Sequence, residues 1–121
     1  MLLATSEREI ILIHYSEDHI GRQILAYAKT ENLALREIDL LHDKITGSQW
    51  SELAEKLGIT VKDLVNQDDP DFMNKFGAIE NLDDHDWLKL LEHNPDILKA
   101  PIVIRGEKYA MMSNPQDMLH F

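Results

Sequence analysis

The stretch YSEDHIGRQ, residues 15–23, holds the side chains best placed to do chemistry. Ser16, Asp18 and His19 supply a hydroxyl, a carboxylate and an imidazole, the three groups that nucleophilic catalysis through a serine combines. Here they are neighbours in the sequence, whereas a catalytic triad draws its members from separate parts of a fold. We therefore interpret Ser16 as the start of a helix cap and His19 as an outward-facing residue, and we expect no catalytic residue.

The histidines raise the question of a metal site. No two of them have the His-x-x-x-His spacing that places two ligands on one helical face beside an acidic residue. The Asp-His-Asp run at residues 84–86 fits a helix cap better than a set of ligands. We expect no metal ion and no resident cofactor. The six histidines are His14, His19, His42, His85, His93 and His120.

Composition excludes several classes of function. The 121 residues include no cysteine, which rules out disulfides, thiolate catalysis and cysteine-ligated metals within this chain. The 22 acidic residues outnumber the 12 basic ones, giving a formal charge of -10. Such a charge repels nucleic acid and anionic membranes unless a basic patch overrides it, and the lysines and arginines are scattered. We expect a protein partner with a basic face, no direct contact with nucleic acid and no membrane contact.

The first 40 residues have the pattern of a strand, a helix and a second strand. EIILIHY, residues 9–15, is rich in β-branched side chains and is typical of a strand buried on both faces. Apolar residues then recur every four positions over residues 18–30, which predicts a helix, and residues 33–40 favour a second strand. Together they predict a βαβ unit with parallel strands. No segment is long and apolar enough to cross a bilayer, so we expect a cytoplasmic protein.

The middle of the chain predicts four helical pieces. The third piece, which begins at Asp69, is expected to bury Phe72, Met73 and Phe76 and to end before Gly77. The pieces begin at Thr46 or Ser48, at Thr60 with Asp63 in a capping box, at Asp69 before Pro70, and at Asp83.

The last third returns to strands. PIVIRGEKYAMM, from Pro101, predicts a hairpin with its turn at residues 105–107, followed by a short helix from Asn114 and Pro115. The whole order predicts an α/β fold with a mixed sheet. We expect one domain over residues 1–121, with a helical insertion at about residues 46–94.

Three stretches carry a family resemblance: ELAEKLGITVKDLVN at 52–66, LLEHNPDILKAPIVIRG at 90–106, and NPQDMLHF at 114–121. With the element order, they resemble the arsenate reductase family, which has the thioredoxin fold and includes the Spx-type transcription regulators. The chain is identified as a cysteine-less, divergent member. The resemblance covers residues 10–121.

The resemblance implies an active-site loop that has lost its function. The family's reactive cysteine stands at the start of the first helix, at a position matching Asp18 or His19. The vestigial loop then consists of Ser16, Glu17, Asp18, His19, Gly21 and Arg22. Glu17 and Asp18 place carboxylates at the positive end of the helix dipole, where an anionic substrate would otherwise bind.

The resemblance also implies positions outside the loop. The family's three oxyanion-binding arginines match Asn66, Ala100 and Met112, or Ser113 in place of Met112. Pro101 matches a proline that the thioredoxin fold holds in the cis form beside the active-site loop. The alternative for Pro101 is an ordinary trans proline at the start of a strand.

Two functions remain open. The first is a non-catalytic binding or regulatory module, for which the Spx resemblance implies RNA polymerase as one partner. The second is an arsenate reductase-like or glutaredoxin-like enzyme that uses glutathione, bound beside Pro101, in place of a resident thiol. The sequence leaves the oligomeric state open, and self-association through the helical insertion and the hairpin is a third possibility.

Overall fold

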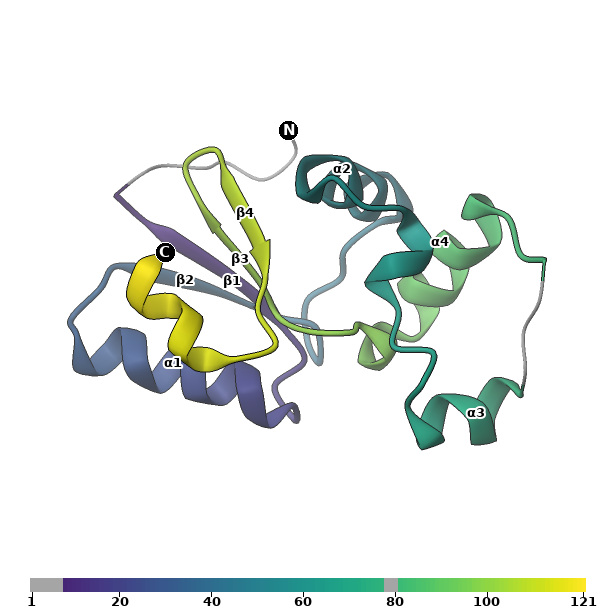
Figure 1. The fold of residues 1–121 in the computed structure, drawn as a ribbon, viewed down its shortest axis with the longest axis horizontal. Helices are drawn as coiled ribbons and strands as arrows, with labels where there is room; N and C mark the ends of the chain where they lie inside the picture. The colour runs from purple at the N-terminus through teal and green to yellow at the C-terminus, as the bar shows by residue number, and fades with distance from the viewer. Residues whose placement is uncertain (1–7, 78–80) are drawn as a thin grey trace. The chain divides into compact units, whose positions relative to one another are not determined.

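The computed structural model describes residues 8–77 and 81–121 (Figure 1). It divides the chain into two compact units. Of the described residues, those up to residue 43 and those at 100–121 form the sheet unit, and those between 44 and 99 form the helical unit. The predicted insertion at about 46–94 therefore falls inside the helical unit. The organisation as a single domain stays a prediction.

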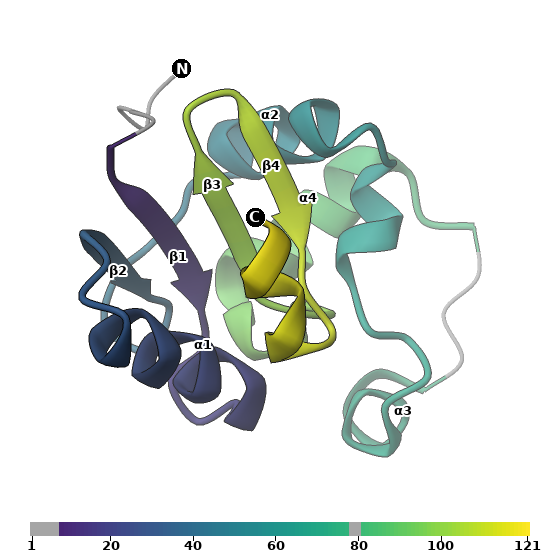
Figure 2. The same cartoon turned by 60° about the vertical axis from the view of Figure 1, so that its left-hand side comes forward.

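The sheet unit is built on four strands in the order β2-β1-β3-β4 (Figure 2). Strand β1 pairs in parallel with β2, as the βαβ pattern predicted, and antiparallel with β3, which forms the hairpin with β4. The mixed α/β sheet is thus confirmed. The strands are β1 Ile10–His14, β2 Leu35–Asp39, β3 Ile102–Arg105 and β4 Lys108–Met111.

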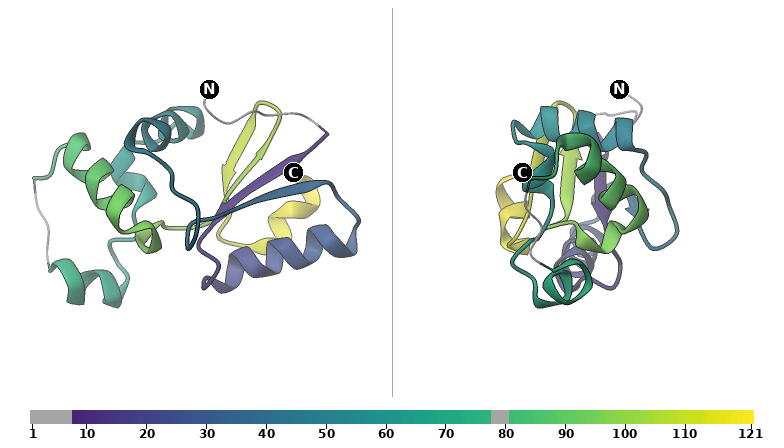
Figure 3. Two further views of the ribbon diagram at one scale, coloured as in Figure 1. Left: turned by 180° about the vertical axis from the view of Figure 1, so that it is seen from behind. Right: turned by 90° about the vertical axis from the view of Figure 1, so that its right-hand side faces the viewer.

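One face of this sheet is covered by α1, His19–Thr30, and by the C-terminal 3-10 helix η3, Pro115–His120 (Figures 1 and 3). Helices α1 and η3 meet on this face because both present apolar side chains to β1. The core of this layer consists of Ile10, Leu12, Ile24, Val103, Met112 and Met118. Burial of such side chains stabilises by about 1.5–3 kcal/mol each relative to exposure.

Every residue of β1 is buried, as its unbroken apolar run predicted. Leu12 and His14 lie on the α1 side, and alternation along the strand turns Ile11 and Ile13 to the other face. The hairpin has a two-residue turn, because Arg105 pairs with Lys108 and belongs to β3 rather than to the turn predicted at 105–107. Gly106 occupies the left-handed region there, with φ of 62°.

The helical unit packs α2, the 3-10 helix η1 and α4 against one another. Their buried side chains include Trp50 and Leu53 from α2, Leu64 from η1, and Trp87 and Leu91 from α4. The elements are α2 Gly47–Leu57, η1 Val61–Leu64, α3 Pro70–Phe76, α4 Asp84–His93 and η2 Pro95–Ile97.

The caps predicted for the helical unit are confirmed. Thr46 and Gln49 form a capping box at the start of α2, which ends at Gly58 in the left-handed conformation. Asp69 and Asp83 cap α3 and α4. Such caps can be predicted from the sequence because the side chain and the N–H that it accepts lie within a few residues of each other.

The predicted burial along α3 is wrong for Met73, whose side chain is 44% exposed. Phe72 is buried and packs on Trp87, with ring centroids 6.4 Å apart, and Phe76 is half-buried beside it. A seven-residue helix has room for one apolar stripe, and Met73 lies off that stripe.

Candidate functional site

The β1–α1 loop joins His14, the last residue of β1, to His19, the first residue of α1. Asp18 caps α1, because its carboxylate accepts the backbone N–H of Ile20 at 3.2 Å. The backbone N–H of Asp18 in turn donates to the carbonyl of Tyr15 at 2.7 Å. The cap expected at Ser16 is therefore wrong by two positions, and an acidic side chain closes the helix N-terminus.

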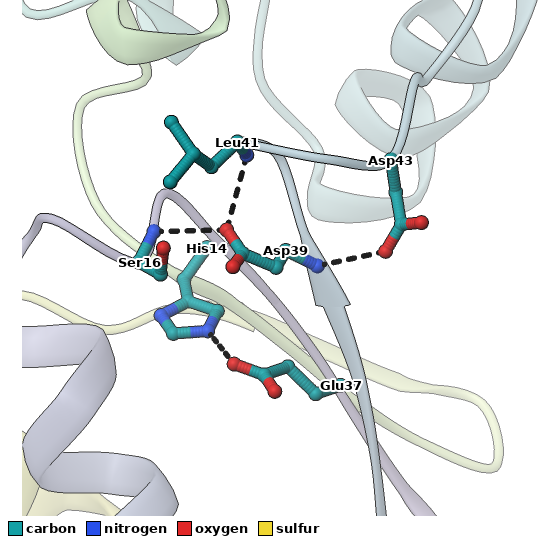
Figure 4. A network of polar contacts seen from close by, with 6 residues as sticks. All are labelled: His14, Ser16, Glu37, Asp39, Leu41 and Asp43. Atoms are coloured by element: carbon teal, nitrogen blue, oxygen red, sulfur yellow. Dashed lines mark hydrogen bonds and ion pairs between the residues drawn. The ribbon is translucent and has the colours of Figure 1, made fainter.

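Ser16 is held by β2 instead. Its backbone N–H donates to the Asp39 carboxylate at 3.1 Å, and the N–H of Leu41 donates to the same oxygen at 3.0 Å (Figure 4). The N–H of Asp39 donates to Asp43 at 3.1 Å. Asp39 thus ties the β1–α1 loop to the turn after β2.

The charge on Asp39 is favoured by these contacts. Burial alone would raise the pKa of this carboxyl, but the N–H of Leu41, the hydroxyl and N–H of Ser16, and nearby His14 together outweigh it. The net result is a pKa below its ordinary value.

His14 is fully buried at the end of β1. Its Nε2 lies 2.6 Å from a carboxylate oxygen of Glu37 on β2, whose side chain is 36% exposed (Figure 4). Among the described residues, Nδ1 has no hydrogen-bond partner. The pair therefore joins a buried imidazole to the outer strand of the sheet.

Gly21, in the first turn of α1, is buried against this imidazole. A Cβ at residue 21 would overlap Nδ1 and would lie only 2.7 Å from Cβ and Cγ of His14. The absence of a side chain at Gly21 is what allows α1 to pack this closely on β1.

The other predicted loop residues are at the surface. Glu17, His19 and Arg22 are exposed. His19 makes a 2.9 Å contact through Nε2 with the amide of Gln23, one turn along α1. The outward orientation expected for His19 is confirmed.

Asn66 belongs to the helical unit, where it is half-buried. Its backbone N–H donates to the carbonyl of Ile97 at 2.9 Å, next to an antiparallel bridge between Val65 and Leu98. The backbone of Asn66 therefore helps to join η1 to the segment after α4.

Ala100, Pro101 and Met112 lie together in the sheet unit, and all three are buried. Met112 donates its backbone N–H to the carbonyl of Pro101 at 2.8 Å, and its side chain lies in the core. The peptide bond before Pro101 is trans, so the cis geometry implied by the resemblance is wrong here. Pro101 precedes β3, where its missing N–H costs no ladder bond, and the more stable isomer is accommodated.

Within residues 8–77 and 81–121, no group of three or more His, Asp or Glu side chains could hold a metal ion. Over the same residues, no helix is both long and apolar enough to cross a membrane.

Sequence reasoning missed the two contacts that organise this region, His14 with Glu37 and Ser16 with Asp39. Each joins residues 23 positions apart. The sequence did contain a signal for the position of His14, namely Gly21 in the first turn of the helix. Glycine is unfavourable in a helix, so its presence there indicates close packing against a neighbouring side chain.

Comparison with protein-family models and with curated protein sequences gives no match. Solved structures do match. An arsenate reductase from Vibrio cholerae superposes with a TM-score of 0.80 at 17% identity, covering 93% of this chain and 97% of its own. The chain has the arsenate reductase fold. An arsenate reductase (ArsC) related protein from Brucella melitensis superposes with a TM-score of 0.71 at 11% identity, covering 98% of both chains.

The arsenate reductase fold places the β1–α1 loop at the N-terminus of a long helix, where free N–H groups attract anions. In this chain, the carboxylate of Asp18 takes the N–H of Ile20 and no thiol is present. The start of α1 in this chain is thus capped by a carboxylate from the β1–α1 loop.

Proposed function

We propose that this chain is a non-catalytic binding module built on the arsenate reductase fold. The observation that supports this proposal most directly is the cap on α1, where the Asp18 carboxylate accepts the N–H of Ile20. An oxyanion approaching that helix end would meet a negative charge already in place. A chain without cysteine also has no thiolate to attack such an anion.

The partner is a protein with a basic face. A formal charge of -10 on 121 residues favours association with positive surfaces and disfavours nucleic acid. Electrostatic attraction of this kind is screened by salt over a Debye length of about 8 Å at physiological ionic strength. RNA polymerase, implied by the resemblance to Spx-type regulators, is one partner to test.

The test has two arms. The first is capture of partners by the tagged full chain from the native extract, repeated as the salt is raised from about 50 mM to about 500 mM. We expect a specific, salt-sensitive protein partner, and the absence of any would count against the proposal.

The second arm measures thermal stabilisation by arsenate, phosphate, sulfate and glutathione. A ligand at about 100 times its Kd stabilises the native state by about 2.7 kcal/mol, which a melting curve detects readily. We expect no shift from any of the four compounds. A shift with glutathione, followed by turnover of arsenate, would establish the enzyme instead.

The structure removes one argument for the glutathione-dependent alternative. It required an extended thiol peptide to pair with backbone beside a cis proline. The bond before Pro101 is trans, and the carbonyl of Pro101 is already taken by the N–H of Met112.

A further inference from the structure

Among the described residues, His14 is the one polar or charged side chain that is fully buried. Neither an anion-binding role nor a partner-binding role uses it, because it lies beneath α1 and has no contact with solvent. A buried imidazole at the junction of β1, β2 and α1 calls for a physical explanation of its own.

The two ring nitrogens of His14 have different surroundings. Nε2 meets the carboxylate of Glu37 at 2.6 Å, whereas Nδ1 faces Gly21 and finds no hydrogen-bond partner in the described part of the chain. A neutral ring protonated at Nε2 donates its single N–H to Glu37 and leaves only a lone pair unused at Nδ1. This tautomer fits the packing as it stands.

A second proton would change the packing. The imidazolium carries an N–H at Nδ1 as well, and the described residues offer no acceptor there. A buried donor without an acceptor is unfavourable, so Nδ1–H requires either water or a new partner. Both need the backbone at Gly21 to move away from the ring, because no side chain separates them.

Two carboxylates of β2 lie near the His14 ring. From β2, Glu37 contacts the ring and Asp39 interacts with it electrostatically. From α1, the residue against the ring is Gly21, which carries no charge, while the Asp18 carboxylate is engaged by Ile20 and Arg22 is exposed. The ring thus has acidic neighbours on β2 and an uncharged, closely packed neighbour on α1.

Asp39 connects this imidazole to the β1–α1 loop, since the same carboxylate that interacts with His14 holds Ser16 and Leu41 (Figure 4). We propose that His14 is an acid-responsive latch: when it takes up a second proton, the first turn of α1 and the β1–α1 loop are released from the C-terminal ends of β1 and β2. The latch uses no thiol and no ligand, and it is independent of the binding function proposed above.

The test is a pH titration of the isotope-labelled full chain by NMR, from about pH 8 to about pH 5, the range in which histidine ordinarily changes charge. The ring nitrogens of His14 report its tautomer and charge, and the amides of Gly21 and Ser16 report the loop. We expect the Nε2–H tautomer at the upper end. On acidification, the two amides should shift with the midpoint of His14, and amide exchange in the first turn of α1 should accelerate by about tenfold.

Two variants and a control sharpen this test. His14→Gln should abolish the linked shifts of Gly21 and Ser16. Glu37→Gln should move the midpoint of these shifts to lower pH, because it removes the carboxylate that contacts the ring. This variant also tests the proposal if His14→Gln does not fold. His19→Gln, at an exposed histidine of the same helix, should leave the linked shifts unchanged.

Three results would overturn the latch. His14 could stay neutral until the chain unfolds in acid. It could titrate while both amides stay still. The amides could also shift in His14→Gln as they do in the unaltered protein.

Discussion

Gly21 of α1 lies against the imidazole of His14, so close that a Cβ at residue 21 would come within 2.7 Å of Cβ and Cγ of His14. The contact fixes how near the helix sits to the end of β1. It also explains why the first turn of α1 tolerates a glycine, which is unfavourable for helix formation by about 1 kcal/mol relative to alanine.

Gly21→Ala is therefore expected to destabilise the protein by about 1–3 kcal/mol, because the buried ring or the helix must shift to admit a methyl group. Chemical denaturation measures the loss. Gly47→Ala is the matched control: it lies in the first turn of α2, where an added Cβ meets Glu92 at an ordinary 3.6 Å, and it should be neutral or slightly stabilising.

A double substitution separates packing from helix propensity. If the loss comes from overlap with the ring, Gly21→Ala should cost far less in a His14→Ala background, which a double-mutant cycle detects. Equal costs in both backgrounds would show that the contact with His14 is not the cause.

Glu92 of α4 accepts the backbone N–H of Gly47 at 2.6 Å, which joins the end of one helix to the start of another. Removing this carboxylate from the positive end of α2 in Glu92→Ala should lower the free energy of unfolding by about 1–3 kcal/mol. Glu92→Gln, which keeps an oxygen acceptor, should lose less. Exposed Glu55 provides the control, since Glu55→Ala should change stability by less than about 0.5 kcal/mol.

Asp18→Ala removes the cap of α1 and should cost about 1 kcal/mol, whereas Asp18→Asn keeps an oxygen that can accept the N–H of Ile20 and should cost less. His19→Ala, at an exposed position, should change stability by less than about 0.5 kcal/mol. If the loop has no catalytic role, partner capture should survive all three changes. A measured turnover that falls in any of them would contradict the binding-module proposal.

Asp39 gives the protein a defined response to acid. Its pKa is lowered in the folded state, so the ionised carboxylate contributes stability above the ordinary value of about 3.8, and that contribution is lost as the pH falls through the lowered pKa. Asp39→Asn should therefore be less stable than the unaltered protein near neutral pH, with the difference shrinking below about pH 4.

Urea denaturation at a series of pH values checks this response. The control is Asp96→Asn, at an exposed carboxylate, which should follow the unaltered protein across the range. A pH-independent difference for Asp39→Asn would mean that its amide, rather than its lost charge, disturbs the loop.

Much of the fold could be predicted from local pattern. The unbroken apolar run of β1, the four-residue spacing in α1 and the caps at Thr46, Asp69 and Asp83 each act over a few residues, and the structure contains them all. The same holds for the parallel pairing of β1 with β2, because a strand-helix-strand unit has few alternative arrangements. The lack of a thiol is a property of the sequence alone.

What the residues of the loop do was decided only by the tertiary structure. Whether Ser16 caps a helix or is held by Asp39, and whether His14 finds Glu37, depends on which strand lies beside β1 and in which register. The trans bond at Pro101 and the exposure of Met73 likewise depend on packing around them. Periodicity and capping are set within a helical turn, whereas a buried imidazole gains its partner only when chain segments 23 residues apart are brought together.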